Sequence, residues 1–275
     1  MLRTILVGLD GSDHSKSAVE LGIVWAKRFD ALLVGLGVID QADICAPEAV
    51  PLGAGAFKGM IDETRLHEAQ VTITNAIEAF SLRCAEEGVS SKPLEDVGRP
   101  AERIALEAQR YDLIMMGRQT FFHLDADPGE TLRSLLNNTP RPIVIVPQQW
   151  REGDGALIAY DGSLQATHAL SAFAASGLAS RTPVHVLSIH EDKIEAARVA
   201  QRAVEYLGFH DIQAQPHAIA ATSSPADLVL EHVNSLKVGL LVMGCYGQST
   251  LREFFLGSVT QALLDNSPIP LFLYH

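Results

Sequence analysis

The chain has 275 residues, of which 47% are hydrophobic and 20% charged, and its formal net charge is −12. This composition is typical of a globular protein with a buried core and excludes a disordered chain. An acidic balance gives no nonspecific affinity for nucleic acid or anionic lipid, and no apolar run reaches the roughly 18–20 residues of a membrane span. We therefore expect no nucleic-acid or membrane partner. Three scattered cysteines and a start that enters a strand directly predict a reducing, cytoplasmic compartment, without disulfides or a zinc site.

An internal repeat divides the sequence into two halves. Each half opens with an apolar run that ends in Asp-Gly-Ser, and two later segments also match in the same order. The matched pairs are 5–12 with 156–163, 113–117 with 240–244, and 135–143 with 263–271. Three ordered matches make chance similarity improbable. We predict two domains, 1–150 and 151–275, joined through the polar stretch 147–155.

Short apolar runs alternate with helical patterns along both halves. In the first half we predict strands at 3–9, 31–39, 92–97, 112–116 and 142–146, and helices at 13–29, 62–87, 100–110 and 130–138. In the second half we predict strands at 155–160, 182–189, 212–219, 239–243 and 270–274, and helices at 164–179, 191–208, 225–236 and 257–266. Continuous apolar runs are typical of parallel strands covered on both faces. The pattern predicts an α/β fold of two doubly wound, Rossmann-like domains, each a five-stranded parallel sheet with helices on both faces.

The halves differ at residues 40–61, which are rich in Ala, Gly and Pro. We expect a long loop there, because the second half passes almost directly from strand to helix at the matching place. Two interpretations stay open, a tolerated surface insertion and a lid over a ligand.

Segment 243–260 carries the strongest functional signal. Gly244 and Gly247 follow a strand, where the absence of side chains lets backbone N–H groups approach an anion. Gly257 and Ser258 open the last helix, whose free N–H groups and dipole favour phosphate. Together with the Asp-Gly-Ser that ends the first strand of this half, the glycines indicate a crevice for a di- or triphosphate. The pattern is neither a P-loop nor a dinucleotide fingerprint, which disfavours NAD.

These residues give the whole chain a resemblance to the universal stress protein family in its tandem two-domain form. The family's ATP-binding pattern is Gly, two residues, Gly, nine residues, Gly, then Ser or Thr, and the second half matches it without a gap. The resemblance implies that Asp161 contacts the nucleoside and that the backbone of Ile189 contacts adenine. We expect ATP, with Mg²⁺, to be held by Asp161, Ile189, Met243, Gly244, Gly247, Gln248, Gly257, Ser258 and Val259.

The first half carries a damaged copy of the pattern. Thr120 lies where the second glycine belongs, the following run is one residue shorter, and Glu130 takes the Ser position. A carboxylate at a helix start satisfies the dipole that would attract phosphate, and it repels a polyphosphate. Asp125 and Asp127 add to the repulsion. We predict ATP in the second half and not the first, although Asp10 leaves binding of a nucleoside without phosphates open.

The resemblance implies an ATP-binding regulatory protein of the stress response, whose occupancy sets its conformation or its protein partner. A slow ATPase or phosphotransferase is the alternative, but no general base can be named for it. A nucleotide-free interaction module is a third reading, against which the intact motif argues. Because single-domain relatives commonly pair through their last strand, we expect 143–146 and 271–274 to pair antiparallel within the chain. Such pseudo-dimers are expected to form a homodimer.

Three further features each allow a plain and a sharper interpretation. His123, Asp125 and Asp127 are either a solvated loop or ligands of a hard cation. Cys245 is either a small loop filler or a redox-sensitive thiol. His185, in the second strand of its half, is expected to be a structural residue rather than a base.

Overall fold

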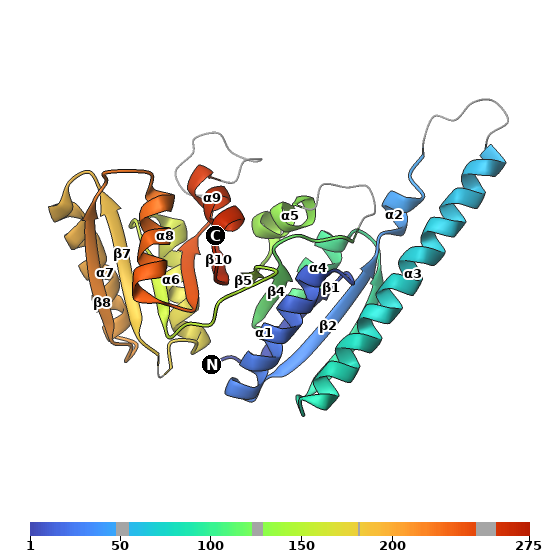
Figure 1. Cartoon of the computed structure of the whole chain (residues 1–275), viewed down its shortest axis with the longest axis horizontal. Helices are drawn as coiled ribbons and strands as arrows, with labels where there is room; N and C mark the ends of the chain where they lie inside the picture. Colours follow the sequence, from blue (N-terminus) through green and yellow to red (C-terminus); the bar gives the residue numbers. More distant parts are fainter. Residues whose placement is uncertain (48–54, 123–128, 181, 246–256) are drawn as a thin grey trace. The chain divides into compact units, whose positions relative to one another are not determined.

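The computed structural model describes the chain as two compact units (Figure 1). One unit comprises Arg3–Pro140, and the other comprises Met1–Leu2 together with Arg141–His275. The residues described are 1–47, 55–122, 129–180, 182–245 and 257–275. Each unit has a mostly parallel sheet with helices on both faces, so the predicted fold class is confirmed.

The unit Arg3–Pro140 has a four-stranded parallel sheet in the order β3-β2-β1-β4. Its elements are β1 (Thr4–Leu9), α1 (Asp13–Phe29), β2 (Leu32–Ile39), α2 (Gln41–Ile44), α3 (Gly55–Glu86), β3 (Ser91–Val97), α4 (Pro100–Ala108), β4 (Leu113–Gly117) and α5 (Glu130–Asn138). Right-handed crossovers put α1 and α3 on one face of the sheet and α4 and α5 on the other.

The other unit has the strand order β5-β10-β9-β6-β7-β8. Its elements are β5 (Ile143–Val146), β6 (Ala156–Ala159), α6 (Leu164–Ser176), β7 (Val184–His190), α7 (Lys193–Gly208), β8 (Ala214–Ala220), α8 (Pro225–Leu236), β9 (Leu240–Gly244), α9 (Ser258–Asn266) and β10 (Leu271–Tyr274). The same crossover rule puts α6 and α7 on one face and α8 and α9 on the other.

Strand β5 is the exception to the parallel arrangement. It pairs antiparallel with β10, and Val144 lies opposite Phe272. The predicted antiparallel pairing of 143–146 with 271–274 is therefore confirmed. The last strand of the first sequence repeat consequently packs in the unit that contains the second repeat.

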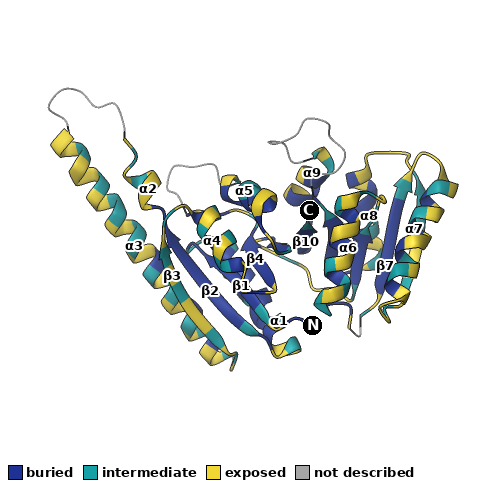
Figure 2. Cartoon of the chain, turned by 180° about the vertical axis from the view of Figure 1, so that it is seen from behind, coloured by how far each residue is buried: buried dark blue, intermediate teal, exposed yellow. Residues whose placement is uncertain are grey.

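The apolar runs of the sequence fill the interiors of both sheets, which are dark in Figure 2. The end strands β3 and β8 differ, because many of their residues are only partly buried. Each of these strands contains a proline, Pro93 or Pro216. Proline cannot donate to a strand ladder, so it is typical of an edge and discourages further pairing there.

The long loop expected at 40–61 is a wrong prediction. Residues 41–44 form α2, whose start is capped by Asp40 through the backbone N–H of Asp43 at 2.9 Å. Helix α3 begins at Gly55 rather than at residue 62. The low helix propensity of Gly55 and Gly59 suggested a loop, but adding a turn to an existing helix costs little once the helix is nucleated. Residues 48–54 of this stretch lie outside the described residues, so neither an insertion nor a lid is described.

Replacing Phe272 by alanine should clearly lower the free energy of unfolding of the second unit. Its ring is fully buried and meets the buried ring of Phe173 edge-on, with 6.0 Å between centroids. Phe272→Ala should lower the free energy of unfolding by about 3–5 kcal/mol, because it leaves a cavity beneath α6. Urea denaturation measures the loss. Phe209→Ala is the control, since that side chain is 86% exposed and its removal should change stability by less than about 0.5 kcal/mol. Equal losses for the two variants would contradict the packing.

Candidate functional site

The predicted site residues that are described lie at the carboxyl edge of the second unit's sheet. Asp161 follows β6, Ile189 lies near the end of β7, and Gly244 ends β9. Strand β6 lies between β7 and β9, because Ala159 pairs with residues of both neighbours. The winding direction reverses at this strand, and doubly wound sheets bind ligands at such a point. Met243, Gly257, Ser258 and Val259 are also described here, whereas Gly247 and Gln248 lie outside the described residues.

The turn after β6 explains why Asp-Gly-Ser recurs in the sequence. The Oδ1 atom of Asp161 accepts the backbone N–H of Ser163 at 2.9 Å, and the Ser163 hydroxyl accepts the N–H of Ala166 at 3.2 Å. Gly162 has φ +77°, a backbone conformation that residues other than glycine rarely adopt. The motif therefore caps α6, and it does so with or without a ligand.

The corresponding aspartate of the first unit is buried and hydrogen-bonded through both carboxylate oxygens. Asp10 is 4% exposed, its Oδ1 atom accepts the N–H of Ser12 at 2.9 Å, and its Oδ2 atom accepts the N–H of Phe121 at 2.6 Å. Asp161 is exposed, and within the described part of the chain its carboxylate accepts a hydrogen bond from Ser163 alone. Both carboxylate oxygens of Asp10 thus accept hydrogen bonds from backbone N–H groups of the first unit.

The residues after β4 cover the end of β1 in the first unit. Thr120 and Phe122 are buried, and the ring of Phe121 lies beside that of His14 with 6.4 Å between centroids. Burial lowers the pKa of His14. No sequence pattern predicts this arrangement, because the decisive donor is the backbone N–H of Phe121, a group that every residue except proline carries.

Two motif glycines have a packing reason, and a third does not. A Cβ atom on Gly244 would lie 2.5 Å from the backbone nitrogen of Ala166, so a side chain there would collide with the first turn of α6. A Cβ atom on Gly117 would lie 2.7 Å from the backbone carbonyl carbon of His14 in the first unit. Among the described residues, a Cβ atom on Gly257 would meet only the Thr260 hydroxyl, at 3.9 Å. The described packing therefore leaves the glycine at 257 unexplained.

The two helix starts that correspond in the repeats differ in charge. Helix α9 begins after Gly257, has no side-chain cap and carries no acidic residue in its first turn. Helix α5 also lacks a side-chain cap, but Glu130 lies in its first turn. The positive end of the α9 dipole is consequently not offset by a carboxylate of its own first turn, whereas that of α5 is.

The buried environment of Cys245 decides between its two interpretations. Its side chain is fully buried, and its backbone N–H donates to the carbonyl of Tyr274 at 2.9 Å. Burial raises the pKa of the thiol to about 12. A thiolate is therefore scarce at neutral pH, so the small-filler interpretation holds and the redox-sensitive one is wrong.

The first unit has a cavity of about 450 Å³ beside the starts of α4 and α5. Its lining includes four carboxylates, those of Asp40, Asp43, Glu102 and Glu130, and the guanidinium of Arg99. Such a lining repels a polyphosphate.

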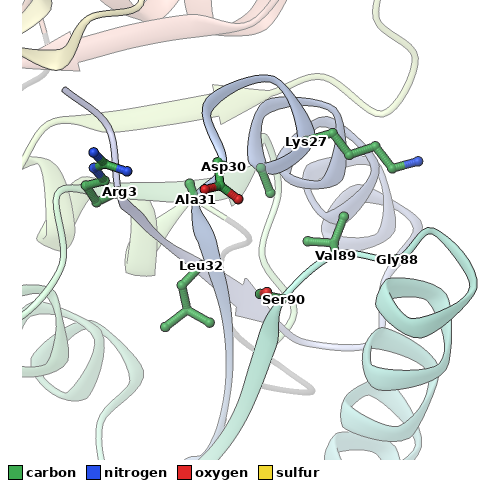
Figure 3. Close-up of a pocket in the computed structure, with 9 residues that line it drawn as sticks. Arg3, Lys27, Asp30, Ala31, Leu32, Gly88, Val89 and Ser90 are labelled. Atoms are coloured by element: carbon green, nitrogen blue, oxygen red, sulfur yellow. The ribbon is translucent and has the colours of Figure 1, made fainter.

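A second cavity of about 460 Å³ lies at the amino edge of the sheet (Figure 3), the opposite edge from the one at which these folds bind ligands. Its lining residues include Arg3, Lys27, Asp30, Leu32, Val89 and Ser90.

The described residues hold neither a metal-binding cluster nor a membrane-spanning helix. They contain no group of three or more His, Cys, Asp or Glu side chains placed to hold a metal ion. His123, Asp125 and Asp127, the loop considered for a cation, lie outside the described residues. Within the described part of the chain, no helix is both long and apolar enough to cross a lipid bilayer.

Comparisons with known proteins agree on one family. The model of the universal stress protein family matches residues 1–147 and again residues 156–275. The universal stress protein Slr1230 of Synechocystis is 21% identical over 99% of this chain and 100% of its own length. The universal stress protein Rv1996 of Mycobacterium tuberculosis is 23% identical over 98% of this chain and 94% of its own length. A solved universal stress protein from Archaeoglobus fulgidus has a TM-score of 0.66 at 20% identity, covering 98% of this chain and 97% of that one.

The glycines at 244 and 257 should respond differently to the same small change. Gly244→Ala should lower the free energy of unfolding by about 1–3 kcal/mol, because the new methyl group forces α6 away from β9. Gly257→Ala should cost less than about 1 kcal/mol, because φ there is −56° and no described residue comes closer to the new methyl group than 3.9 Å. Thermal and urea unfolding of both variants measure the difference. A loss at 257 that matches the loss at 244 would show that Gly257 has a packing role.

The two aspartates should also differ. Asp10→Ala leaves the N–H groups of Ser12 and Phe121 without their carboxylate, which should cost about 1–3 kcal/mol in the buried setting. Asp161→Ala should cost under about 1 kcal/mol, because water can replace an exposed acceptor. The free energies of unfolding from urea titrations are the measurement. If Asp161→Ala proves the more damaging substitution, Asp10 does not hold the segment after β4 in place.

Proposed function

Because the chain belongs to the universal stress protein family, we propose that it binds ATP with Mg²⁺ in its second repeat, residues 151–275, and not in its first, residues 1–150. The observation that carries this proposal is the contrast between Asp161 and Asp10. Asp161 is exposed at the carboxyl edge of its sheet, whereas both oxygens of Asp10 are bonded to its own chain.

The start of α9 supplies the phosphate end of the proposed site. Its first N–H groups have no side-chain cap, and Ser258 is exposed beside them. Backbone donors at a helix start and the dipole behind them both favour an anion. The glycine at 257 keeps this approach open, a role that accounts for a residue which the described packing does not require.

Strand β7 supplies the base end. The carbonyl of Leu187 accepts the N–H of Tyr160 just past β6, and the carbonyl of His190 accepts the N–H of Ala221 on the opposite side, both at 2.9 Å. Successive residues of a strand direct their backbone groups to opposite sides, so Ile189 directs its N–H and C=O to the β6 side, beyond the end of that strand. A donor and an acceptor side by side match an adenine edge, and Asp161, which follows β6 at the same edge of the sheet, is the acceptor that we propose for a ribose hydroxyl.

The first repeat differs at its aspartate and at the corresponding helix start. The Asp10 carboxylate is already bonded, Glu130 lies at the start of α5, and four carboxylates line the nearby cavity. Two charges near 4 Å interact by about 1 kcal/mol in water and by several times more where solvent is excluded. Since about 1.4 kcal/mol is a factor of ten in affinity, a triphosphate should strongly prefer the second repeat.

The family membership extends the proposal from ligand to role. The bound nucleotide would act as a signal in the stress response, setting which conformation or which protein partner is favoured. The proposal includes a cytoplasmic location and a homodimer of the whole chain.

Isothermal titration calorimetry with MgATP should give a stoichiometry near one per chain. Gly257→Asp should abolish the binding heat, because a carboxylate then lies at the phosphate end of the site. Gly129→Asp, the matched change at the start of α5, should leave the affinity nearly unchanged. Two equivalent sites, or binding that is lost in Gly129→Asp and kept in Gly257→Asp, would overturn the assignment.

Protein for this titration must first be shown to be free of nucleotide. The retained small molecule is released by denaturation and identified by chromatography. A melting temperature that does not move at millimolar MgATP would also count against the proposal, because a ligand at 100 times its Kd stabilises the native state by about 2.7 kcal/mol.

A further inference from the structure

Three histidines gather in the second unit, away from the proposed nucleotide site. The Nδ1 atom of His185 on β7 lies 3.0 Å from the Nε2 atom of His217 on β8, and their ring centroids are 5.2 Å apart. The ring of His232 on α8 lies 6.3 Å from that of His217. Metal binding is not what this group is arranged for, because no metal-holding set occurs among the described residues.

The histidines join the edge of the sheet to its covering helix. In the β7–β8 register, His217 is paired with Leu187, two residues along from His185, so both imidazoles lie on the same face of the sheet. The ring contact of His217 with His232 shows that α8 covers this face. Strand β8 has β7 as its only neighbour in the described sheet, so the contact joins an end strand to the rest of the unit.

We propose that His185 and His217 form a proton-sensitive latch, which holds β8 and α8 on β7 at neutral pH and releases them when the solution becomes mildly acidic. The latch stands independently of the proposed nucleotide site.

Proton counting explains the direction of the switch. A hydrogen bond between two imidazoles needs one N–H group and one lone pair. A first added proton still leaves one lone pair on the two facing nitrogens, so the hydrogen bond between the imidazoles is kept. A second proton turns both facing nitrogens into donors, so the bond breaks and two positive charges face each other in a partly buried place. His232 is the next imidazole along and adds to this repulsion.

The surroundings favour the uncharged pair. Burial lowers the pKa of His185, and burial, followed by the charges of His185 and His232, lowers the pKa of His217. The carboxylates of α8, Asp227 and Glu231, are exposed. Strands β6 and β8 bring no carboxylate to this face, and α7 covers the other face.

The sign of the pH dependence follows from these shifts. The unfolded chain binds protons at the ordinary histidine pKa near 6.5, whereas the folded chain resists them. The contribution of the pair to stability is therefore complete above about pH 6.5 and falls as the pH drops through the lowered values.

Nuclear magnetic resonance titration of the imidazoles in the intact chain tests the latch directly. Two resonances, assigned to His185 and His217, should titrate below about 6.5, and their chemical shifts should change together with those of the β8 amides. Titration of both imidazoles at or above about 6.5 would overturn the proposal, whatever any variant does.

A paired variant separates proton binding from packing. In His185→Asn with His217→Gln, an amide oxygen and an amide nitrogen can replace the two facing ring nitrogens, and neither group titrates. Native-state hydrogen exchange compares this variant with the wild type at about pH 7.5 and about pH 5.5, after correction for the intrinsic rates. Wild-type amides at 214–220 should lose at least about tenfold more protection on acidification than those of the paired variant, a factor that corresponds to about 1.4 kcal/mol.

His210→Gln is the matched control, because His210 is exposed in the same unit. It should keep the acid-dependent loss of protection seen in the wild type. The same loss in the paired variant as in the wild type would refute the latch, and so would a loss spread evenly over both units.

Discussion

The hydrogen-bonded Asp-Gly-Ser turn is the constraint on which both units depend. In each unit the aspartate accepts the serine N–H and the serine caps the following helix, while the glycine between them takes a positive φ. This turn fixes where α1 and α6 begin. The chain at the end of β4 or β9 then has to pass close to the new helix start, and only Gly117 and Gly244 leave room for it. Much of what looks like a ligand motif in the sequence is thus also a requirement of folding.

The proposed functional asymmetry rests on the different surroundings of that aspartate in the two units. In the first unit the oxygen accepts the N–H of Phe121, and the segment after β4 is held over the end of β1. A carboxylate at the start of α5 completes the departure from a phosphate site. In the second unit Asp161 is exposed and the start of α9 has no such carboxylate. Under the proposed assignment, one copy of the fold binds the ligand and the other serves as framework.

Periodicity and the internal repeat predicted the strands and the fold class, because these depend on where apolar runs lie. The antiparallel pairing of β5 with β10 was expected from the resemblance to relatives that pair through their last strand. Periodicity and the repeat failed at residues 55–61, where glycines suggested a loop and the chain continues α3 instead. Local propensity is a weak guide when a long helix already exists nearby.

Parts of the candidate site were also beyond the sequence. The motif glycines could be found by spacing, but spacing does not separate Gly244, which packing requires, from Gly257, which it does not. The bond from Phe121 to Asp10 and the contact of His185 with His217 join residues 111 and 32 positions apart. Neither has a local pattern, since one uses a backbone group and the other depends on strand register.

Hydrogen–deuterium exchange with and without MgATP tests the central claim most directly, because it reports each repeat separately in one experiment. The account predicts that ATP protects the backbone at 159–164, 188–190 and 257–260 while leaving 8–13 and 129–132 unchanged. Protection confined to 8–13 and 129–132, or shared equally between the two sets, would contradict the assignment of the nucleotide to the second repeat.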